Sequence, residues 1–325
     1  MLHTWDDLPA AVRAAIEAET GPVTRAEAPA AGRNSDFAAT LHTGRGLVFC
    51  KGIADAGGKR GTMHRHEADI NPHLPPAVAP RLLWRAEADD WLLLGFEHVI
   101  GHHADLSPGS PDLPLVADTV SAMSRELRGC PAPNVPALTD KMAWMSGWRR
   151  LRHRPPAGLD QWSLDRLDLL VDWEARGIEA VAGDNLLHTD LHPLNILVDD
   201  SRAAWVIDWA WSQTGAPWVD TAHLVVRLIG QGHTPEAAEH WAATTAAWSG
   251  ASTDALTSFS VALLGMWTYL QHTDPLPMRA ELTAAARTWA CHRLAKPSEP
   301  PAERTPQAEE RANRTATTAH RSRPI

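Results

Sequence analysis

The chain has 325 residues, which suits two domains or lobes, and its hydrophobic content of 44% can supply a substantial core. Its net charge of −9 argues against a protein that binds nucleic acid by electrostatic attraction. The sequence has neither a secretory signal nor an apolar run of the roughly 18 residues that a membrane span needs, and its three cysteines lack CxxC spacing, so we expect a cytoplasmic protein that contacts no membrane.

The first 96 residues are predicted to form a β-rich unit. Thr4 and Asp7 have the spacing of a capping box, and the apolar residues that follow recur at helical intervals, so a helix is expected over residues 4–18. Short runs of β-prone residues, two of them joined by the hairpin signal Thr43-Gly44-Arg45, predict an antiparallel sheet. The expected strands are residues 37–42, 46–50, 81–84 and 91–96, and a short helix is expected at 63–70.

Helices are predicted to dominate after Phe96. Residues 101–114 are polar and rich in proline, which indicates a loop. Ser163 is the predicted N-cap of the helix that follows it, and Thr234 precedes a proline at the first position of another helix. Residues 296–325 have almost no apolar side chains, so they are predicted to be disordered. The expected helices are residues 116–127, 163–176, 253–272 and 277–294, with a further one that begins at 234.

Negative charge is concentrated in the second part of the chain. Residues 97–295 contain 14 Lys and Arg against 23 Asp and Glu, a difference of −9, whereas the first 96 residues contain 10 against 12. An acidic surface can attract a cationic small molecule, so a cationic binding partner is one prediction from this surplus. A solvated acidic surface without a binding role is the other.

The most informative segment runs from His188 to Asp208. It contains the pattern H-x-D-x-x-x-x-N, which ends at Asn195, and then a second acidic residue at the end of an apolar run. Transfer of a phosphoryl group from ATP needs a carboxylate that orients the acceptor hydroxyl and oxygen ligands that hold Mg²⁺ on the phosphates. Asp190 is the candidate for the first role, and Asn195 and Asp208 are the candidates for the second.

The local structure expected for this segment brings the two metal-ligand candidates together. Residues 195–198 and 204–207 are β-prone, and residues 199–202 between them are typical of a turn. A hairpin of this length would place Asn195, at the start of one strand, beside Asp208, at the end of the other. The spacing therefore fits a metal site that straddles a hairpin.

With these residues the chain resembles the protein-kinase-like superfamily and, within it, the aminoglycoside phosphotransferase and choline kinase branch. His192-Pro193 inside the loop and Asp208-Trp209 in place of Asp-Phe-Gly are characteristic of that branch. The resemblance implies an α+β fold with two lobes, a small β-rich N-lobe that binds nucleotide and a larger helical C-lobe with the catalytic loop and the acceptor site. The implied boundaries are 1–96 for the N-lobe, 97–101 for a hinge, 102–295 for the C-lobe and 296–325 for the disordered tail.

A lysine and a glutamate in the N-lobe match the same pattern. Lys51 ends an apolar strand and is one of only four lysines in the chain. In the kinase-like pattern this lysine grips the α and β phosphates and pairs with a helix glutamate, for which Glu67 is the match. A solvent-facing strand lysine is the alternative interpretation of Lys51, and Glu87 is a second acidic residue in the same lobe.

Other nucleotide contacts are assigned by the resemblance alone. The phosphate loop is a version with a single glycine, Gly32, and with Asn34 and Ser35 near its tip, where backbone N–H groups could reach phosphate oxygens. Glu97 C=O and Val99 N–H occupy the hinge positions that pair with adenine. An ordinary linker between the lobes is the alternative interpretation of this stretch.

Two residues are expected to support the catalytic loop without taking part in the chemistry. His188 occupies the superfamily's structural histidine position. Asp220 resembles the aspartate that opens the next helix and holds the loop through backbone hydrogen bonds. A plain helix N-cap is the alternative interpretation, and the two roles are compatible. His192 is expected to be structural or to lie near the acceptor.

The predicted function is that of an ATP- and Mg²⁺-dependent O-phosphotransferase that acts on a hydroxyl of a small molecule, with Asp190 orienting or deprotonating this acceptor. The sequence carries no signature for the identity of the acceptor or for the oligomeric state. Two other classes compete with this prediction. One is a kinase-like protein that binds nucleotide with weak catalysis or none. The other is a metallohydrolase with His188, Asp190 and His192 as ligands, which leaves Lys51 and Asn195 without a role.

Overall fold

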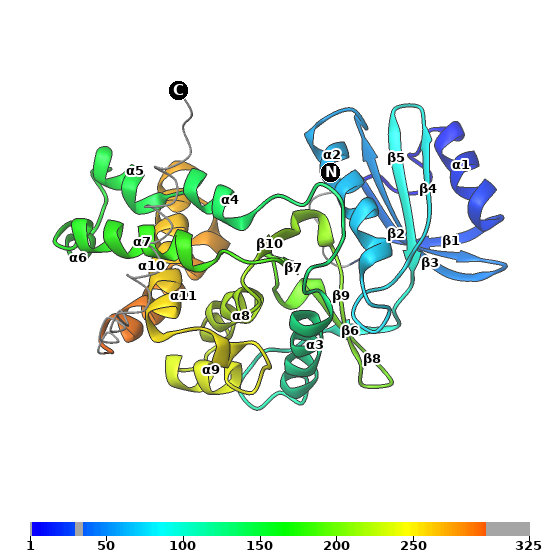
Figure 1. The fold of residues 1–325 in the computed structure, drawn as a ribbon. Helices are drawn as coiled ribbons and strands as arrows, with labels where there is room; N and C mark the ends of the chain where they lie inside the picture. Colours follow the sequence, from blue (N-terminus) through cyan, green and yellow to red (C-terminus); the bar gives the residue numbers. More distant parts are fainter. Residues whose placement is uncertain (1, 30–34, 297–325) are drawn as a thin grey trace, which may run out of the picture.

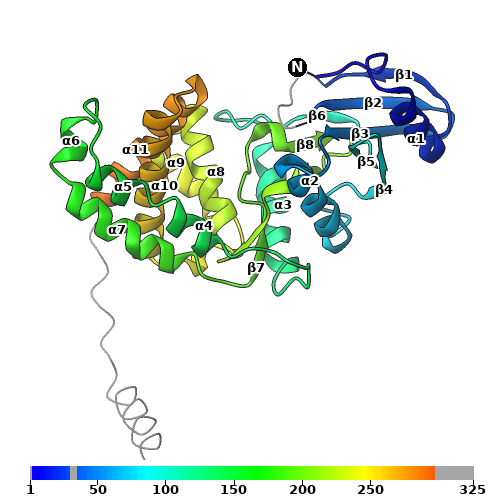
Figure 2. The ribbon, with the colours of Figure 1, turned by 90° about the horizontal axis from the view of Figure 1, so that it is seen from above.

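The computed structural model describes residues 2–29 and 35–296. Figure 1 shows a β-sheet with two helices at one end of the molecule, a group of helices at the other end, and short strands between them. The view from above in Figure 2 shows the same separation. The mixed α+β, two-lobed architecture expected from the sequence is therefore confirmed.

The N-lobe sheet has the strand order β1-β2-β3-β5-β4, and every neighbouring pair is antiparallel. The predicted hairpin is confirmed, because Thr43 pairs with Gly46 across the β2–β3 turn. The first strand was not expected, since its sequence VTRAE lacks apolar alternation and it pairs only with β2 at the edge of the sheet. The strands are β1 (Val23–Glu27), β2 (Phe37–Thr43), β3 (Gly46–Ala54), β4 (Leu82–Ala88) and β5 (Trp91–Glu97).

Helices α1 (Ala10–Thr20) and α2 (Lys59–Ile70) cover opposite faces of this sheet. Ile16 of α1 belongs to the same apolar cluster as Cys50, whereas Ala68 of α2 packs in a second cluster on the other face. Successive side chains of a strand point to opposite faces, so Lys51 must point toward α2 when Cys50 points toward α1. The alternation of β3 therefore aims this lysine at the helix that carries Glu67.

The first helix begins later than its capping signal predicts. Asp7 Oδ2 accepts hydrogen bonds from Thr4 N at 3.0 Å and from Thr4 Oγ1 at 2.6 Å. The hydroxyl of Thr4 thus donates to the carboxylate instead of accepting from a helix N–H, so the reciprocal arrangement of a capping box does not form. These bonds close a turn before Pro9, and α1 starts at Ala10.

The C-lobe is built around the long helix α10, which packs against α5, α7 and α11. Two glycines let neighbouring helices approach α10 closely. A β-carbon on Gly147 would meet the backbone oxygen of Gly265 at 2.0 Å, and one on Gly177 would meet that of Ser258 at 2.7 Å. The helices are α3 (Leu113–Glu126), α4 (Leu138–Trp144), α5 (Gly147–His153), α6 (Gln161–Leu164), α7 (Leu167–Ala180), α8 (Val219–Gly230), α9 (Pro235–Ala242), α10 (Thr253–Thr273) and α11 (Pro277–Leu294).

Short strands lie between the sheet and these helices, and 3₁₀ turns occur at several points along the chain. The predicted hairpin forms, with Ile196 of β8 opposite Val206 of β9. A third strand, β6, pairs with β8. This strand lies at the start of the segment 101–114, which the sequence predicts to be a loop. The strands are β6 (Gly101–His103), β7 (Asn185–Leu187), β8 (Ile196–Asp199), β9 (Ala204–Val206) and β10 (Gln213–Gly215), and the 3₁₀ turns are η1 (Asn71–His73), η2 (Pro193–Asn195), η3 (Trp209–Trp211) and η4 (Trp248–Gly250).

One of the two predicted helix caps in the C-lobe is confirmed. Thr234 Oγ1 accepts from the backbone N–H of Ala237 at 3.1 Å, as an N-cap of α9 should. Ser163 is not an N-cap, because it lies inside the short helix α6, whose cap is Asp160. The carboxylate of Asp160 accepts from both the backbone and the hydroxyl of Ser163, and the next helix begins only at Leu167.

The predicted disorder of residues 296–325 concerns a segment that, apart from Lys296, lies outside the described residues. Within residues 2–29 and 35–296, no helix has both the length and the apolar character required to cross a membrane.

Candidate active site

Asp220 supports the loop that follows β7. It lies in the first turn of α8, and its carboxylate accepts the backbone N–H groups of His188 at 2.8 Å and Thr189 at 2.9 Å. Thr189 has a φ of 60°, which is unusual for a β-branched residue, and it is held there by these contacts and by the bond from its hydroxyl to Trp211 O. The N-cap position of α8 belongs to Trp218, so the Asp220 carboxylate serves the loop and not its own helix.

His188 is fully buried beneath the same loop. Its Nε2 donates to Ile207 O at 2.9 Å, and its Nδ1 accepts from Asp190 N at 3.2 Å. Burial lowers the pKa of His188 to about 4, which keeps the ring in the neutral form that this bonding requires. Because both ring nitrogens have protein partners, the ring is not free to bind a metal.

This bonding counts against the metallohydrolase alternative, in which His188 would be a metal ligand. Nor does the part of the chain that the structure describes contain a group of three or more His, Cys, Asp or Glu side chains arranged to hold a metal ion. His192 lies with its Nε2 3.9 Å from Asp190 Oδ2, and burial, followed by the charge of Arg227, lowers its pKa to about 4.

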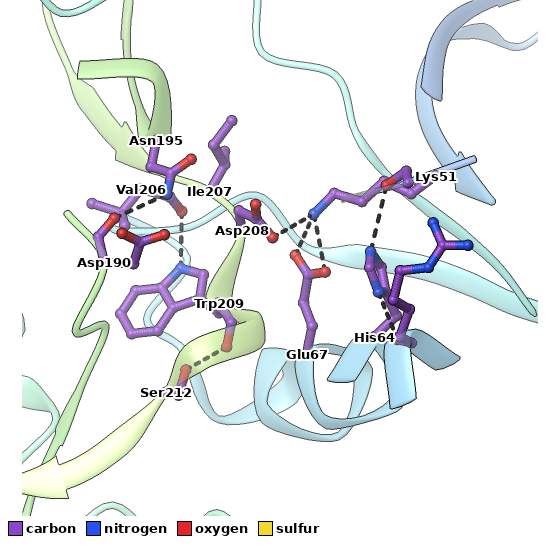
Figure 3. A network of polar contacts seen from close by, with 12 residues as sticks. Lys51, His64, Glu67, Asp190, Asn195, Val206, Ile207, Asp208, Trp209 and Ser212 are labelled. Carbon is purple, nitrogen blue, oxygen red and sulfur yellow. Dashed lines mark hydrogen bonds and ion pairs between the residues drawn. The ribbon is translucent and has the colours of Figure 1, made fainter. Parts of the chain in front are cut away.

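The β8–β9 hairpin brings Asn195 and Asp208 to the same place. Ile207 N donates to Asn195 O at 3.0 Å, which joins the residues that flank the two strands. Asn195 Nδ2 donates to Asp190 O at 3.0 Å and so ties the hairpin to the loop that carries Asp190 (Figure 3). Asp208 has a left-handed backbone with a φ of 65°, and this turn directs the chain from β9 into η3.

Lys51 links the two lobes through a pair of carboxylates. Its Nζ donates to both oxygens of Glu67, at 2.7 and 3.0 Å, and to Asp208 Oδ1 at 3.2 Å. Figure 3 shows the three side chains converging from β3, α2 and the end of the hairpin. Glu67 is therefore the partner of Lys51, whereas Glu87, the other candidate, binds Arg65 and Arg85.

The charges of this cluster reinforce one another. Burial alone would lower the pKa of Lys51, but the carboxylates of Asp208 and Glu67 outweigh it and raise the pKa above its ordinary value. In return, the charge of Lys51 lowers the pKa of Asp208. The lysine is therefore charged and Asp208 is ionised at neutral pH, as binding of a metal–phosphate complex requires.

Asp190 sits in a different environment from Asp208. Burial, together with the charge of Asp208, raises its pKa to about 6, and the nearby Arg227 and Lys141 oppose the shift. Arg227 Nη2 lies 3.7 Å from Asp190 Oδ1. A carboxylate with a pKa just below neutrality is ionised at pH 7 and still basic enough to take a proton from a reacting hydroxyl.

Part of the predicted nucleotide site can be placed. Ser35, Glu97 and Val99 all line one cavity, of about 1980 Å³, that also contains Lys51 and Asp190. Ser35 Oγ lies 3.4 Å from the Nε2 of His64 on α2, and the side chain of Glu97 binds Arg81. The two other residues assigned to the phosphate loop, Gly32 and Asn34, lie outside the described residues.

Sequence reasoning missed three side chains that line the same cavity as Asp190. They are Lys141 of α4 and His223 and Arg227 of α8. His223 and Arg227 are four residues apart and so share one face of α8. The rarity of lysine in this chain was a usable signal for Lys141, whereas Arg227 is one of 26 arginines and had none.

Comparisons with known proteins place the chain among phosphotransferases. An aminoglycoside phosphotransferase from Alicyclobacillus acidocaldarius has a similar structure, with a TM-score of 0.61, 15% identity and coverage of 89% of this chain and 94% of the other. The choline kinase LicA from Streptococcus pneumoniae has a TM-score of 0.58 and 12% identity, over 86% of this chain and 98% of the other. A spectinomycin phosphotransferase, APH(9)-Ia, in complex with ADP and spectinomycin has a TM-score of 0.53 and 12% identity, over 88% of this chain and 94% of the other. These identities establish the fold alone, and a search of curated protein sequences gives no match. The model of the phosphotransferase enzyme family (APH) matches residues 61–256, more than half of the chain, and the protein therefore belongs to this family.

Proposed function

We propose that the protein is an ATP- and Mg²⁺-dependent O-phosphotransferase that acts on a hydroxyl group of a small molecule. The observation that carries the proposal is the convergence of Lys51, Glu67 and Asp208 on the cavity that Asp190 and Asn195 also line. Phosphoryl transfer depends mainly on positioning and on charge stabilisation, and these residues are of the types that supply both. The ADP and spectinomycin bound in the similar spectinomycin phosphotransferase support a nucleotide and a small molecule as ligands.

The nucleotide would bind along the N-lobe side of the cavity. Lys51 would contact the α and β phosphates while Glu67 fixes the direction of its ammonium group. Glu97 C=O and Val99 N–H would pair with adenine, and Ser35 would face the phosphates together with Gly32 and Asn34. Lobe boundaries at residues 1–96, 97–101 and 102–295 are part of this proposal.

The residues present fit a magnesium ion. Asp208 and Asn195 would hold it, because hard cations prefer carboxylate and amide oxygens. The bond from Asn195 Nδ2 to Asp190 O fixes the amide so that its nitrogen faces the loop and its oxygen is turned away from that carbonyl. When bound, magnesium would neutralise charge that develops on the phosphates during transfer.

Asp190 would act on the acceptor. Its carboxylate accepts a hydrogen bond from the acceptor hydroxyl and aligns the oxygen with the γ-phosphorus of ATP. A bond forms between this oxygen and the phosphorus while the bond from the phosphorus to the β–γ bridging oxygen breaks, which yields the phosphorylated acceptor and ADP. The hydroxyl proton passes to Asp190, whose pKa of about 6 suits that transfer, and then to solvent.

The free thiols of Cys50, Cys130 and Cys291 are compatible with a reducing cytoplasm.

The test is transfer of label from γ-³²P-ATP to a panel of hydroxyl compounds, together with ADP release, in the presence and absence of Mg²⁺. Asp208→Asn should weaken Mg·ATP binding by about tenfold or more and leave metal-free ATP binding nearly unchanged, because the carboxylate contacts the metal and not the adenine. Equal losses with and without magnesium would rule out this role for Asp208. Nucleotide binding without ADP release from any acceptor would instead favour the non-catalytic binding protein.

A further inference from the structure

Two cationic side chains stand on the acceptor side of Asp190. Arg227 approaches the carboxylate to 3.7 Å and its side chain is only 15% exposed. Lys141 lines the same cavity, with its Nζ 5.2 Å from the centre of the Trp211 ring. Burial lowers the pKa of both side chains, and the charge of Asp190 opposes this shift in each. Lys51 is instead paired with Glu67 and Asp208.

Carboxylates that could bind an ammonium group are scarce in this cavity. Among the described residues five carboxylates line it, and four of them have strong partners of their own. Asp190 is the fifth, and it already faces two cations. The four are Glu67 and Asp208, which bind Lys51, Glu97, which binds Arg81, and Glu174, which accepts the backbone N–H groups of Trp148 and Arg149.

The histidines beside Asp190 do not change this balance. Burial, followed by the charge of Arg227, lowers the pKa of His192 to about 4 and that of His223 to about 3, so both rings are neutral at pH 7. Arg227 and Lys141 therefore add two positive charges next to the single negative charge of Asp190, while Asp208, whose charge also acts on Asp190, is paired with Lys51. An isolated positive charge in a partly buried site is costly until an anion compensates it.

A wall of large apolar side chains lines the same cavity as the two cations. It is formed by α4, by α10 and by the start of α11. Several of its members are unusually exposed for their type: Trp144 by 70%, Met278 by 43% and Leu276 by 36%. Exposed apolar side chains that gather inside a cavity are typical of a site for an apolar ligand.

We propose that the acceptor is a hydroxy acid with an apolar body, in which a carboxylate lies close to the hydroxyl that is phosphorylated. This inference rests on the phosphotransferase activity proposed above. Lys141 and Arg227 would bind the carboxylate, the apolar wall would bind the body, and Asp190 would be left for the hydroxyl. A polycationic acceptor would meet two like charges here and, among the described residues, no carboxylate that lacks a partner. The acidic surplus of residues 97–295 is therefore not found in this region of the cavity.

A matched set of three probes tests this proposal: 3-hydroxydecanoate, its methyl ester and 1-aminodecan-3-ol, which share a body and a hydroxyl but carry a negative, neutral or positive group. The full chain with Mg²⁺ and a non-hydrolysable ATP analogue would be titrated with each probe by calorimetry, and ADP release would be followed with ATP. The carboxylate should bind about tenfold or more tightly than the ester, since hydrogen bonds between charged groups are the stronger ones. The amine should bind more weakly than the ester.

The variants Lys141→Met and Arg227→Met should each remove most of the preference for carboxylate over ester while the affinity for the ester stays the same. Arg152→Met is the matched control, because Arg152 is exposed on α5, binds Asp168 and lies outside the cavity. It should keep the full preference. If Arg227→Met does not fold, Lys141→Met and the probe comparison on the wild-type protein still decide the matter.

Three results would overturn the proposal. The first is that the carboxylate and the ester bind equally or not at all, and the second is that the amine binds more tightly than the ester. The third is that both variants lose Mg·ATP binding and acceptor-independent ATP hydrolysis to the same extent. The last would show that the cations serve the γ-phosphate. If the wild-type protein binds Mg·ATP and releases ADP but shows no carboxylate preference, only this proposal fails. If it does neither, the proposed function fails as well.

Discussion

In the half of the cavity that we propose for the nucleotide, one cation, Lys51, meets two carboxylates, whereas in the half that we propose for the acceptor, two cations face the carboxylate of Asp190. Lys51 is paired with Glu67 and Asp208 within 3.2 Å, so the side chains of the protein alone hold this cluster together. Asp190, Arg227 and Lys141 are farther apart, and their charges do not balance. The first half is thus preorganised for a fixed partner, while the second half depends on the ligand to complete it.

Replacing Asp190 should have the largest effect on turnover. Asp190→Asn keeps the shape of the side chain but removes the negative charge and the proton acceptor, so kcat should fall by about 10²–10⁴-fold. Nucleotide binding should stay close to that of the wild type, because Lys51 and Asp208 do not depend on this carboxylate for their contacts. Turnover equal to that of the wild type on a true acceptor would show that another group has the role.

Lys51→Met should lower kcat/KM for Mg·ATP by about a hundredfold or more, since a preorganised charge on the phosphates is lost. It should also destabilise the protein by about 3–5 kcal/mol, because Lys51 is only 8% exposed and its removal leaves Glu67 buried without a partner. Because of this burial, a loss of stability is part of the prediction. Urea unfolding and steady-state kinetics measure the two effects.

The double variant Lys51→Met with Glu67→Gln separates these two effects. It removes the unpaired charge, so much of the stability should return while activity stays low. Recovery of both would mean that the loss of activity in the single variant came from unfolding. Lys51→Arg should not restore activity, because the broader guanidinium group has a different reach and geometry.

Asp220→Ala should reduce kcat by about ten- to a hundredfold through misplacement of the catalytic loop. The backbone N–H groups of His188 and Thr189 lose their acceptors, so stability should fall by about 1–3 kcal/mol. Thr234→Ala is the control, because loss of this N-cap costs about 1 kcal/mol far from the cavity and should leave kcat unchanged. A similar fall in kcat for both variants would mean that activity follows overall stability.

The nucleotide half was largely predictable because its geometry follows from local rules. Side-chain alternation along β3 sets the direction of Lys51, and the length of the hairpin brings Asn195 to Asp208. The acceptor half follows from no such rule. Lys141 lies on a helix of seven residues, too short for its apolar pattern to reveal which face points into the cavity, and it reaches Asp190 only through the packing of distant segments.

Two helix starts and one strand were predicted wrongly or not at all, because the local sequence does not specify them. Thr4, Asp7 and Ser163 do form local hydrogen bonds between side chain and backbone, but such bonds suit turns as well as helix caps. Strand β1 was not predicted, because it is an edge strand with a polar sequence. Its pairing with β2 specifies it, and it has no apolar pattern of its own.

The pH dependence should give the smallest effect and the most direct view of the acceptor half. With a pKa of about 6 in the free enzyme, Asp190 becomes protonated as the pH falls, and a protonated carboxyl cannot take the hydroxyl proton. The value of kcat/KM, which reports on the free enzyme, should therefore fall about tenfold per pH unit below 6 and level off above 7.

Buried Asp220 also has a pKa of about 6, so the profile alone does not identify the group. Arg227→Met separates the two, because Arg227 lowers the pKa of Asp190 and has no effect on that of Asp220. In this variant the acid limb should move to higher pH, whereas an unchanged limb would assign it to Asp220 and place Asp190 outside the titration that controls transfer.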